Sequence, residues 1–457
     1  MKRHRVFFFL LLALLPTQLG YHVWPEWAYV LGRRVDYLSP TLYFTDILVL
    51  LIICSWFIDS KARIRGFVLR ITEKKIKSVH EVFPLIRTTK YVILFLLIVA
   101  ANIFVSVSKP VALSYWIKVG EFFLLGWYIV KTKPRIESLV IPIAIGVLFS
   151  SILAIVQFSL QHSVGGMLWW FGERTFTVDT PGIARIELCG IWNHVCRLFL
   201  RPYATFSHPN VLGGFLAVIL PLLLYTLVRP TKSIRQILQI RQIRQILQIQ
   251  NIEGKINIIR QWLMRSALLL GSVALVLTFS RSAWIAGGAG IGITYFVLGK
   301  KHGRNFMSSL VMALIFIVFT VLVVRGMDFS GESVVVRQQL NAAALTLWRQ
   351  SPIIGVGLGN FLVQLPSVLP VRTIYFLQPV HNVYLMVLSE VGLIGLGIFL
   401  WIVYRAVTIR TVHVSPVFRI SLLLLLLLGL VDHYAVTLEQ GQLLLTVLLA
   451  VNLTPHS

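Results

Sequence analysis

The sequence is poor in charged residues and in cysteine. Charged residues make up 13% of its 457 residues and hydrophobic residues 57%, whereas a soluble domain carries about 25% and about 45–50%, respectively. This composition excludes a soluble enzyme, a disordered chain and a collagen-like chain, and it indicates a polytopic membrane protein. The three cysteines are too few for a disulfide scaffold or a CxxC zinc site.

Acidic residues are scarce, which leaves the chain strongly basic. The 42 Lys and Arg residues against 17 Asp and Glu residues give a formal net charge of +25. In a soluble protein this excess would suggest a nucleic-acid partner. In a membrane protein the positive charge of cytoplasmic loops accounts for it, so we expect membrane lipids and no nucleic acid as partners.

Long apolar stretches are abundant. A membrane-spanning helix needs about 20 mostly apolar residues. About twelve stretches qualify as candidates, near 6–20, 41–58, 91–108, 111–130, 139–158, 209–228, 266–280, 283–299, 306–324, 382–404, 418–434 and 441–453. The first follows a basic segment, as a signal peptide does, but no A-x-A-like cleavage site follows it, so we interpret it as a helix. Together the stretches predict one all-α transmembrane domain over 1–457.

The basic residues predict how this domain is oriented. With the N-terminus inside and strict alternation, 29 Lys and Arg residues fall on the inner side and 12 on the outer side. Both termini are then cytoplasmic. Two long outer loops follow, 159–208 and 325–381, and loops of this length are usually functional or disordered. Cys189 and Cys196 share the first of them, where an oxidising space would permit a disulfide.

A basic inner loop, 229–265, contains an internal repeat. The sequence of 234–242 recurs with small changes at 243–251. Its Ile and Leu residues can form an apolar stripe beside basic residues, which suits a helix on an anionic inner leaflet. A low-complexity expansion without a role explains the repeat equally simply, and we expect no catalysis there.

Two segments on the predicted outer side carry candidate arginines. Arg201 precedes His208 and Asn210 at the start of a predicted helix, and a helix N-terminus favours an anion. Arg281 is the only charged residue between Arg265 and Lys300. It can hold a phosphate in a bidentate manner. Ordinary helix capping at the first segment and a headgroup contact at the second are the structural alternatives.

Two further segments combine helical spacing with polar residues. Apolar residues after Arg337 recur at helical spacing and predict an amphipathic helix that ends at Pro352, followed by a tight glycine turn over 355–360. His381 opens the tenth predicted span, where an imidazole can act as a base or have a structural role. Glu390 lies nearly half a turn out of phase with His381, so we expect it to be a structural partner inside the bundle.

The outer loops lack the acidic patterns of common metal sites and hydrolases. They contain no Asp-x-Asp or Glu-x-x-His motif and no paired-carboxylate signature. Arginines and histidines at a membrane-level groove remain. Such a set can bind a phosphate-bearing lipid without a metal, so we expect neither a metal nor another cofactor.

In their order along the chain, these motifs resemble those of the O-antigen ligase family. The family also includes O-antigen polymerases and protein O-oligosaccharyltransferases. The similar features are Arg-x-x-x-Thr-Phe-x-His-Pro-Asn at 201–210, Ser-Arg at 280–281, Arg337, Pro-x-x-Gly-Val-Gly at 352–357, and His381-Asn382 with Gly392 and Gly395. Ala204 and Leu396 depart from residues frequent in the family.

The resemblance implies a GT-C-like glycosyltransferase of the bacterial inner membrane, with the second long loop, partly helical, capping a cavity that faces the periplasm. The donor would be a glycan on undecaprenyl pyrophosphate. The acceptor would be a hydroxyl of lipid A core, another glycan or a protein. Carried over by position, the resemblance implies catalysis by His381, pyrophosphate binding by Arg281, Arg337 and Arg201, and further substrate contacts by His208, Asn210, Asn382 and Tyr384.

Other activities fit the same sequence. A polymerase or a protein O-oligosaccharyltransferase of the same superfamily needs the same donor handling. A transporter or flippase is an alternative of another class, because twelve helices suit it and Lys118 with Glu121 can form a coupling pair. These two residues lie three positions apart, however, and can simply satisfy each other. No pair of broken helices in matching halves supports transport.

Overall fold

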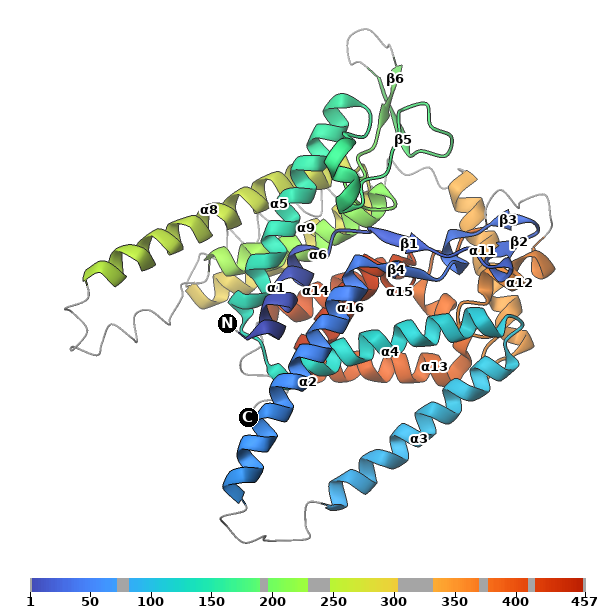
Figure 1. Ribbon diagram of the computed structural model, residues 1–457. Coiled ribbons are helices and arrows are strands. Elements are labelled where there is room, and N and C mark those ends of the chain that lie inside the picture. The colour runs from blue at the N-terminus through green and yellow to red at the C-terminus, as the bar shows by residue number, and fades with distance from the viewer. Residues whose placement is uncertain are drawn as a thin grey trace.

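The computed structural model describes residues 2–71, 82–189, 196–228, 247–302, 332–369, 377–409 and 416–454. In these ranges the chain is mostly helical (Figure 1). The helices are α1 (Arg3–Ala13), α2 (Phe44–Ile71), α3 (Val82–Val105), α4 (Lys109–Thr132), α5 (Ile136–Leu160), α6 (Pro209–Val228), α8 (Leu247–Leu277), α9 (Arg281–His302), α11 (Glu332–Gln350), α12 (Phe361–Val368), α13 (Val383–Thr408), α14 (Pro416–Leu428), α15 (Tyr434–Thr437) and α16 (Glu439–Leu453).

Most of the predicted apolar stretches overlap a helix. The stretch at 306–324 lies outside the described residues, as do residues 234–246 of the repeat over 234–251. By length and composition, four described helices can cross a membrane: Ser138–Leu160, Pro209–Val228, Asn257–Leu277 and Val383–Thr408. Two shorter apolar helices are Val92–Val105 and Pro416–Leu428. The described chain is therefore a helical membrane protein, and the count of twelve spans stays a prediction.

Helix α6 forms the centre of the bundle. It begins at Pro209, whose fixed φ suits the first turn of a helix and whose missing N–H needs no partner there. Its side chains are almost all apolar, and most are buried against α8, α9 and α14. A helix that is apolar on all sides belongs in an interior. The segment that precedes α6, with Arg201 and His208, is thereby fixed to the core.

Short strands are the main departure from the all-α prediction. Among the described residues, three antiparallel pairs form: β1 (Gly20–His22) with β4 (Thr41–Tyr43), β2 (Tyr29–Val30) with β3 (Arg33–Arg34), and β5 (Arg185–Cys189) with β6 (Cys196–Leu200). Cys189 stands opposite Cys196 in the register, and Cys196 is disulfide-bonded. Hairpins this short leave no periodicity that a search for apolar stretches can detect.

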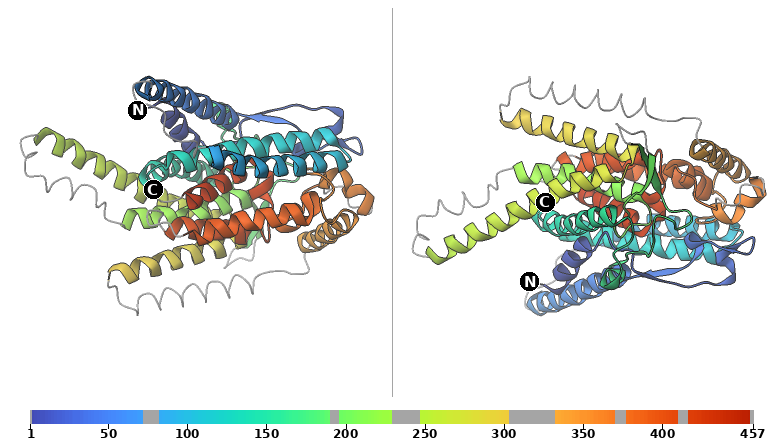
Figure 2. Two further views of the ribbon diagram at one scale, coloured as in Figure 1. Left: turned by 90° about the horizontal axis from the view of Figure 1, so that it is seen from below. Right: turned by 90° about the horizontal axis from the view of Figure 1, so that it is seen from above.

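The small strands β2 and β3 gather with α11 and α12 at one end of the bundle. Both chain termini lie towards the opposite end, as two views at right angles to Figure 1 show (Figure 2). The β1–β4 pair connects α1 with α2 along this side. The end with α11 and α12 therefore combines segments from the beginning and the last third of the chain.

A glycine turn fastens the chain after α11 to α13. Gly355 and Gly357 have φ values of +78° and +106°, and Gly392 inside α13 has +66°. The amides of Val356 and Gly357 donate to carbonyls of α13 at 2.9 and 3.0 Å, and those of Leu393 and Ile394 donate to the carbonyls of Pro352 and Ile353, just before the turn. This confirms the predicted tight turn with close backbone approach.

Gly355→Ala is expected to destabilise the protein, because a Cβ atom at this position would lie 2.3 Å from the carbonyl carbon of Glu390. The positive φ alone costs about 1–3 kcal/mol for a residue with a side chain, and the clash adds to it. Thermal unfolding of the purified protein in detergent measures the loss. Gly397→Ala in α13 is the control, because a Cβ atom there meets nothing within 4 Å. Equal melting temperatures for both variants would refute the close packing.

Candidate functional site

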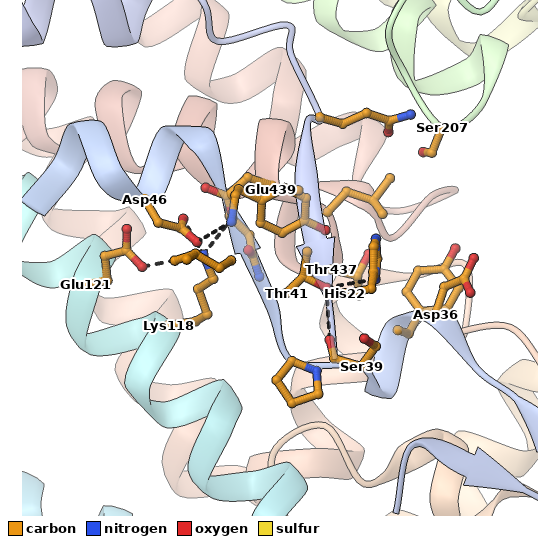
Figure 3. Close-up of a pocket in the computed structure, with 18 of the residues that line it drawn as sticks. His22, Asp36, Ser39, Thr41, Asp46, Lys118, Glu121, Ser207, Thr437 and Glu439 are labelled. Carbon is orange, nitrogen blue, oxygen red and sulfur yellow. Dashed lines mark hydrogen bonds and ion pairs between the residues drawn. The ribbon is translucent and has the colours of Figure 1, made fainter. Parts of the chain in front are cut away.

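A cavity of about 1370 Å³ lies among the described residues, lined by the segment with β1 and β4, by α2 and α4, and by the segments that precede α6, α13 and α15. Four histidines line it: His22, His208, His381 and His433. Figure 3 shows part of its wall, with Ser207 from the segment before α6 on one side and Asp46 from α2 on another. Segments far apart in the sequence thus meet at one hollow.

His381 lies at the wall of this cavity, two residues before α13. Its Nε2 atom is 2.9 Å from Oε1 of Gln378, and its Nδ1 atom is 3.8 Å from Oδ1 of Asp432. The ring of His433 stands 4.9 Å from its own, centroid to centroid. The imidazole is mostly buried and faces a carboxylate, an arrangement that suits a general base held in a fixed orientation.

Asp432 and His433 were missed by the sequence analysis, which placed them inside an apolar stretch. Burial alone would raise the pKa of the Asp432 carboxyl, but the His381 and His433 rings hold it well below its usual range. Burial lowers the pKa of His433 to about 4, against the raising effect of Asp432. At neutral pH the pair is therefore a carboxylate beside a neutral imidazole. A signal was present, since polar residues within an apolar stretch are functional candidates by default.

The same three groups form a possible metal-ligand set. One ligand atom each of His381, Asp432 and His433 lie within 4.8 Å of one another. Two imidazoles and one carboxylate are donors that zinc and other transition metals accept. Sequence spacing cannot reveal this set, because 50 intervening positions separate His381 from Asp432. Chelation of the purified protein is therefore needed to test the predicted absence of a metal.

The segment before α6 holds its polar residues in one network. Arg201 donates through Nε to the Thr278 carbonyl at 2.7 Å and through Nη2 to Oδ1 of Asn210 at 2.6 Å. The amide of Asn210 donates to Nδ1 of His208 at 3.1 Å. Burial, reinforced by Arg201, lowers the pKa of His208 to about 4, so this imidazole is neutral at pH 7. His208 and Asn210 both line the cavity.

The three predicted arginines lie around this network. Burial, together with the charge of Arg281, lowers the pKa of Arg201 to about 10, which leaves it charged at neutral pH. Arg281 is the exposed first residue of α9. Arg337 lies on α11, close enough that its charge adds to burial in lowering the pKa values of His208 and His433. In the described part of the chain, no carboxylate lies within ion-pair distance of any of the three.

Asn382 and Tyr384 connect α13 to the end of α14. Oδ1 of Asn382 accepts from the amides of Tyr384 and Leu385 at 2.9 and 3.0 Å, and its Nδ2 donates to the Leu430 carbonyl at 3.1 Å. The Tyr384 hydroxyl donates to the carbonyl of Leu426 at 3.0 Å. These contacts hold the segments of His381 and Asp432 together. A direct contact of either residue with substrate stays a prediction.

Glu390 is buried and accepts a hydrogen bond from the amide of Phe361 at 3.2 Å. Its backbone carbonyl accepts from Gly357 and from Nδ2 of Asn102. This confirms the expectation from helical phase that Glu390 is a structural partner inside the bundle. The side chain therefore supports the glycine turn and does not assist His381.

The buried neutral histidines make stability depend on pH. The folded pKa values of His208 and His433 lie near 4, below the ordinary value of 6.5, so the unfolded chain binds more protons between these values. The contribution of these two histidines to the free energy of unfolding is fully present above about pH 6.5, and it is lost as the pH drops towards 4. We expect a lower melting temperature at pH 5 than at pH 7.5, and a smaller difference for His433→Asn. A melting temperature that rises on acidification would contradict this.

The fold and the cavity define a helical membrane protein with a site built from histidines, arginines and one buried aspartate. Residues 266–400 match a family model described as O-antigen ligase. The matched segment includes Arg281, Arg337 and His381, and it supports the resemblance to the O-antigen ligase family that the motifs indicate. A search of curated proteins found no match.

Proposed function

We propose that the protein is an envelope glycosyltransferase that moves a glycan from undecaprenyl pyrophosphate to an acceptor hydroxyl. The observation that carries this proposal is that His381 faces Asp432 at the wall of a cavity. Arg201 is hydrogen-bonded to Asn210 of the cavity lining, and the charge of Arg337 acts on His433. Transfer of this kind needs a base for the hydroxyl and cations for the departing diphosphate. The described residues offer both kinds of group.

The reaction makes one bond and breaks one. The acceptor oxygen attacks the anomeric carbon of the donor sugar, and the bond from that carbon to the diphosphate oxygen breaks with its electron pair leaving on the diphosphate. The hydroxyl proton passes to the His381 imidazole. The Asp432 carboxylate, 3.8 Å from Nδ1, stabilises the imidazolium that forms. General-base assistance of this type contributes about 10²–10⁴-fold.

The arginines act on the leaving group. A diphosphate departs without protonation if its developing charge is held, and guanidinium groups do this through paired hydrogen bonds. Arg281 and Arg337 are the principal candidates, and Arg201 supports them from the segment before α6. His208 and Asn210 offer additional contacts where this segment meets the cavity.

We propose that transfer needs no metal. Treatment of the purified protein with EDTA is therefore expected to leave the rate within about twofold of the untreated value, since arginines alone stabilise the charge. Transfer is measured with a lipid-linked glycan before and after chelation. Activity lost to EDTA and restored by Zn²⁺ or Mn²⁺ would instead assign the His381, Asp432 and His433 group to a metal.

A deletion strain complemented with wild type or with His381→Ala tests the proposed function. Lipid-linked and surface glycans are profiled together in each strain. Long glycans that remain on undecaprenyl pyrophosphate, with a bare surface acceptor, indicate a ligase. Single repeat units, on the carrier or on the surface, indicate a polymerase, and loss of protein glycans indicates a protein O-oligosaccharyltransferase. Unchanged glycans in both compartments would exclude transfer and favour a transporter.

A further inference from the structure

His381, Asp432 and His433, here called the His–Asp–His set, meet at the wall of the cavity from two segments of the chain. His381 precedes α13, whereas Asp432 and His433 follow α14. All three residues line the cavity, and one potential ligand atom of each lies within 4.8 Å of those of the other two. A small ligand that enters the cavity can therefore reach all three side chains at once.

The Nδ1 atom of His381 is buried and has no hydrogen-bond partner among the described residues. The other ring nitrogen, Nε2, lies 2.9 Å from the amide oxygen of Gln378. An amide oxygen only accepts hydrogen bonds, so the proton of the neutral imidazole is on Nε2 and the lone pair is on Nδ1. This lone pair faces Oδ1 of Asp432 at 3.8 Å. Two electron-rich atoms that face each other in a buried position are stabilised by a cation between them.

His433 has its free lone pair on Nε2. The Thr437 hydroxyl donates its one proton to the His433 carbonyl at 3.0 Å. The same hydroxyl oxygen lies 2.6 Å from Nδ1 of His433, so it accepts a hydrogen bond there and Nδ1 carries the proton. Thr437 and Gln378 thus each fix the proton of one imidazole, which is how histidines that bind metals are usually held.

Asp432 adds an anionic oxygen to the two nitrogen donors. Its Oδ1 atom accepts from the amide of His433 at 2.8 Å, which orients the carboxylate. Zinc binds two imidazoles and one carboxylate in sites whose fourth position stays open, whereas Mg²⁺ and Ca²⁺ prefer oxygen ligands alone. The cavity provides both the open position and a path of entry.

The set needs only a small adjustment to close around an ion. Ligand atoms of a tetrahedral zinc ion lie roughly 3.4 Å apart, and those of the set lie within 4.8 Å of one another. Asn382 and Tyr384 already bind the start of α13 to carbonyls at the end of α14. Rotation of the side chains can therefore close the set without movement of the helices.

Two neighbours of the set favour reversible binding over a permanent structural ion. His208 lines the same cavity, but its Nδ1 atom accepts from the Asn210 amide at 3.1 Å, so its Nε2 carries a proton and offers no lone pair. The positive charge of Arg337 acts on His433 and opposes a cation. The described protein therefore provides three ligands and an opposing charge.

We propose that His381, Asp432 and His433 form a binding site for zinc or a similar transition-metal ion, and that the bound ion inhibits transfer. The inhibitory role rests on the proposed transferase function. The ion occupies the lone pair on Nδ1 with which His381 would accept the proton of the acceptor hydroxyl. Nε2 cannot replace it, because its own proton is donated to Gln378.

Titration of the full-length protein with Zn²⁺ in detergent tests the site. Bound metal is first removed with EDTA, and the EDTA is then removed by dialysis. The Cys54→Ser variant is the reference protein, because Cys54 is an exposed free thiol and thiolates bind zinc. We expect calorimetry to detect a zinc ion bound to each chain, and Co²⁺ at the same site to give the visible absorption of a coordinated ion.

Asp432→Asn in this reference protein removes the anionic ligand with little change in shape. The affinity for Zn²⁺ is expected to fall by more than about 100-fold, because loss of a ligand costs more than loss of an outer hydrogen-bond partner. His22→Asn is the matched control, since His22 lines the same cavity and does not belong to the set. Its affinity is expected to stay within about twofold of the reference. Equal affinities of the two variants would overturn the site.

Thr437→Val tests the assigned proton positions without removal of a ligand. Thr437 is labelled in Figure 3 at the wall of the cavity. The valine variant loses the acceptor for Nδ1 of His433, so the affinity for Zn²⁺ is expected to fall about 10–100-fold, and Thr437→Ser is expected to restore most of it. A lower melting temperature of Thr437→Val with unchanged affinity would show a structural role only and would contradict the assignment.

Transfer by the reference protein is measured with and without saturating Zn²⁺. We expect transfer to slow by more than about tenfold, since the base is blocked, and to recover when EDTA is added. Mg²⁺ is expected to have no effect, because it binds nitrogen ligands poorly. An unchanged or faster rate in the zinc-loaded protein would overturn the inhibitory role.

The zinc results can be separated from those of the transferase test, because zinc binding needs no transfer. Zinc binding that Asp432→Asn abolishes, in a protein that transfers no glycan, would keep the site and reject the proposed function. Glycan transfer by a protein that binds no zinc would keep the function and reject the site.

Discussion

His381→Ala is expected to reduce glycan transfer by about 10²–10⁴-fold, the range that a general base contributes. The imidazole lies at the cavity wall and faces the Asp432 carboxylate, whose Oδ1 atom is 3.8 Å from Nδ1. Its loss leaves the acceptor hydroxyl without a proton acceptor in a fixed position. Single-turnover transfer with a purified lipid-linked glycan measures the effect on the chemical step.

His162→Ala is the matched control for this measurement. His162 lies outside the cavity, and its Nδ1 atom contacts the carbonyl of Ser163. The control is expected to transfer within about twofold of wild type, as surface substitutions usually do. If His381→Ala kept more than about a tenth of the activity, the role of His381 as base would be refuted. Equal protein levels and melting temperatures must accompany either result.

Arg337→Ala is expected to lower transfer by about 10²–10³-fold, the cost of removing one preorganised donor to a developing anion. Its charge already acts on His208 and His433 in the protein without substrate. The Arg337 charge would interact more strongly with a diphosphate, which carries negative charge. Arg337→Lys is expected to recover only part of the loss, because an ammonium cannot hold two oxygens in a planar fork.

The same helix provides a matched control for the arginine. Arg349 is exposed near the C-terminal end of α11, so Arg349→Ala removes one positive charge from the helix without altering the site. Its transfer rate is expected to stay within about twofold of wild type. If Arg349→Ala and Arg337→Ala were equally impaired, the effect would be one of general surface charge and the specific assignment would fail.

The sequence predicted the helices and the glycine turn because both leave local signals. Apolar stretches mark helices such as α6, and the positions of Gly355 and Gly357 mark a turn that needs positive φ. The helical phase of Glu390 correctly separated it from His381, although His381 lies two residues before α13.

Contacts between distant segments could not be predicted in this way. Asp432 meets His381 because hydrogen bonds from Asn382, Val383 and Tyr384 hold the start of α13 against residues 426–430 at the end of α14. Contacts between such distant segments leave no local signature. The ion pair of Lys118 with Glu121 was anticipated from their spacing, whereas the contribution of Asp46 and Glu439 was not. These two residues reach Lys118 from α2 and α16, at opposite ends of the chain.

The glycine turn has a mechanical consequence. It binds the chain after α11 to α13 through backbone hydrogen bonds in both directions, with no side chain between Gly355 and Gly392 to slide or change rotamer. α11 carries Arg337, and α13 begins just after His381. The two helices therefore form one rigid unit. Arg337 and His381 keep a constant separation in it throughout a catalytic cycle. Movement that admits or releases substrate is then expected in elements outside this unit.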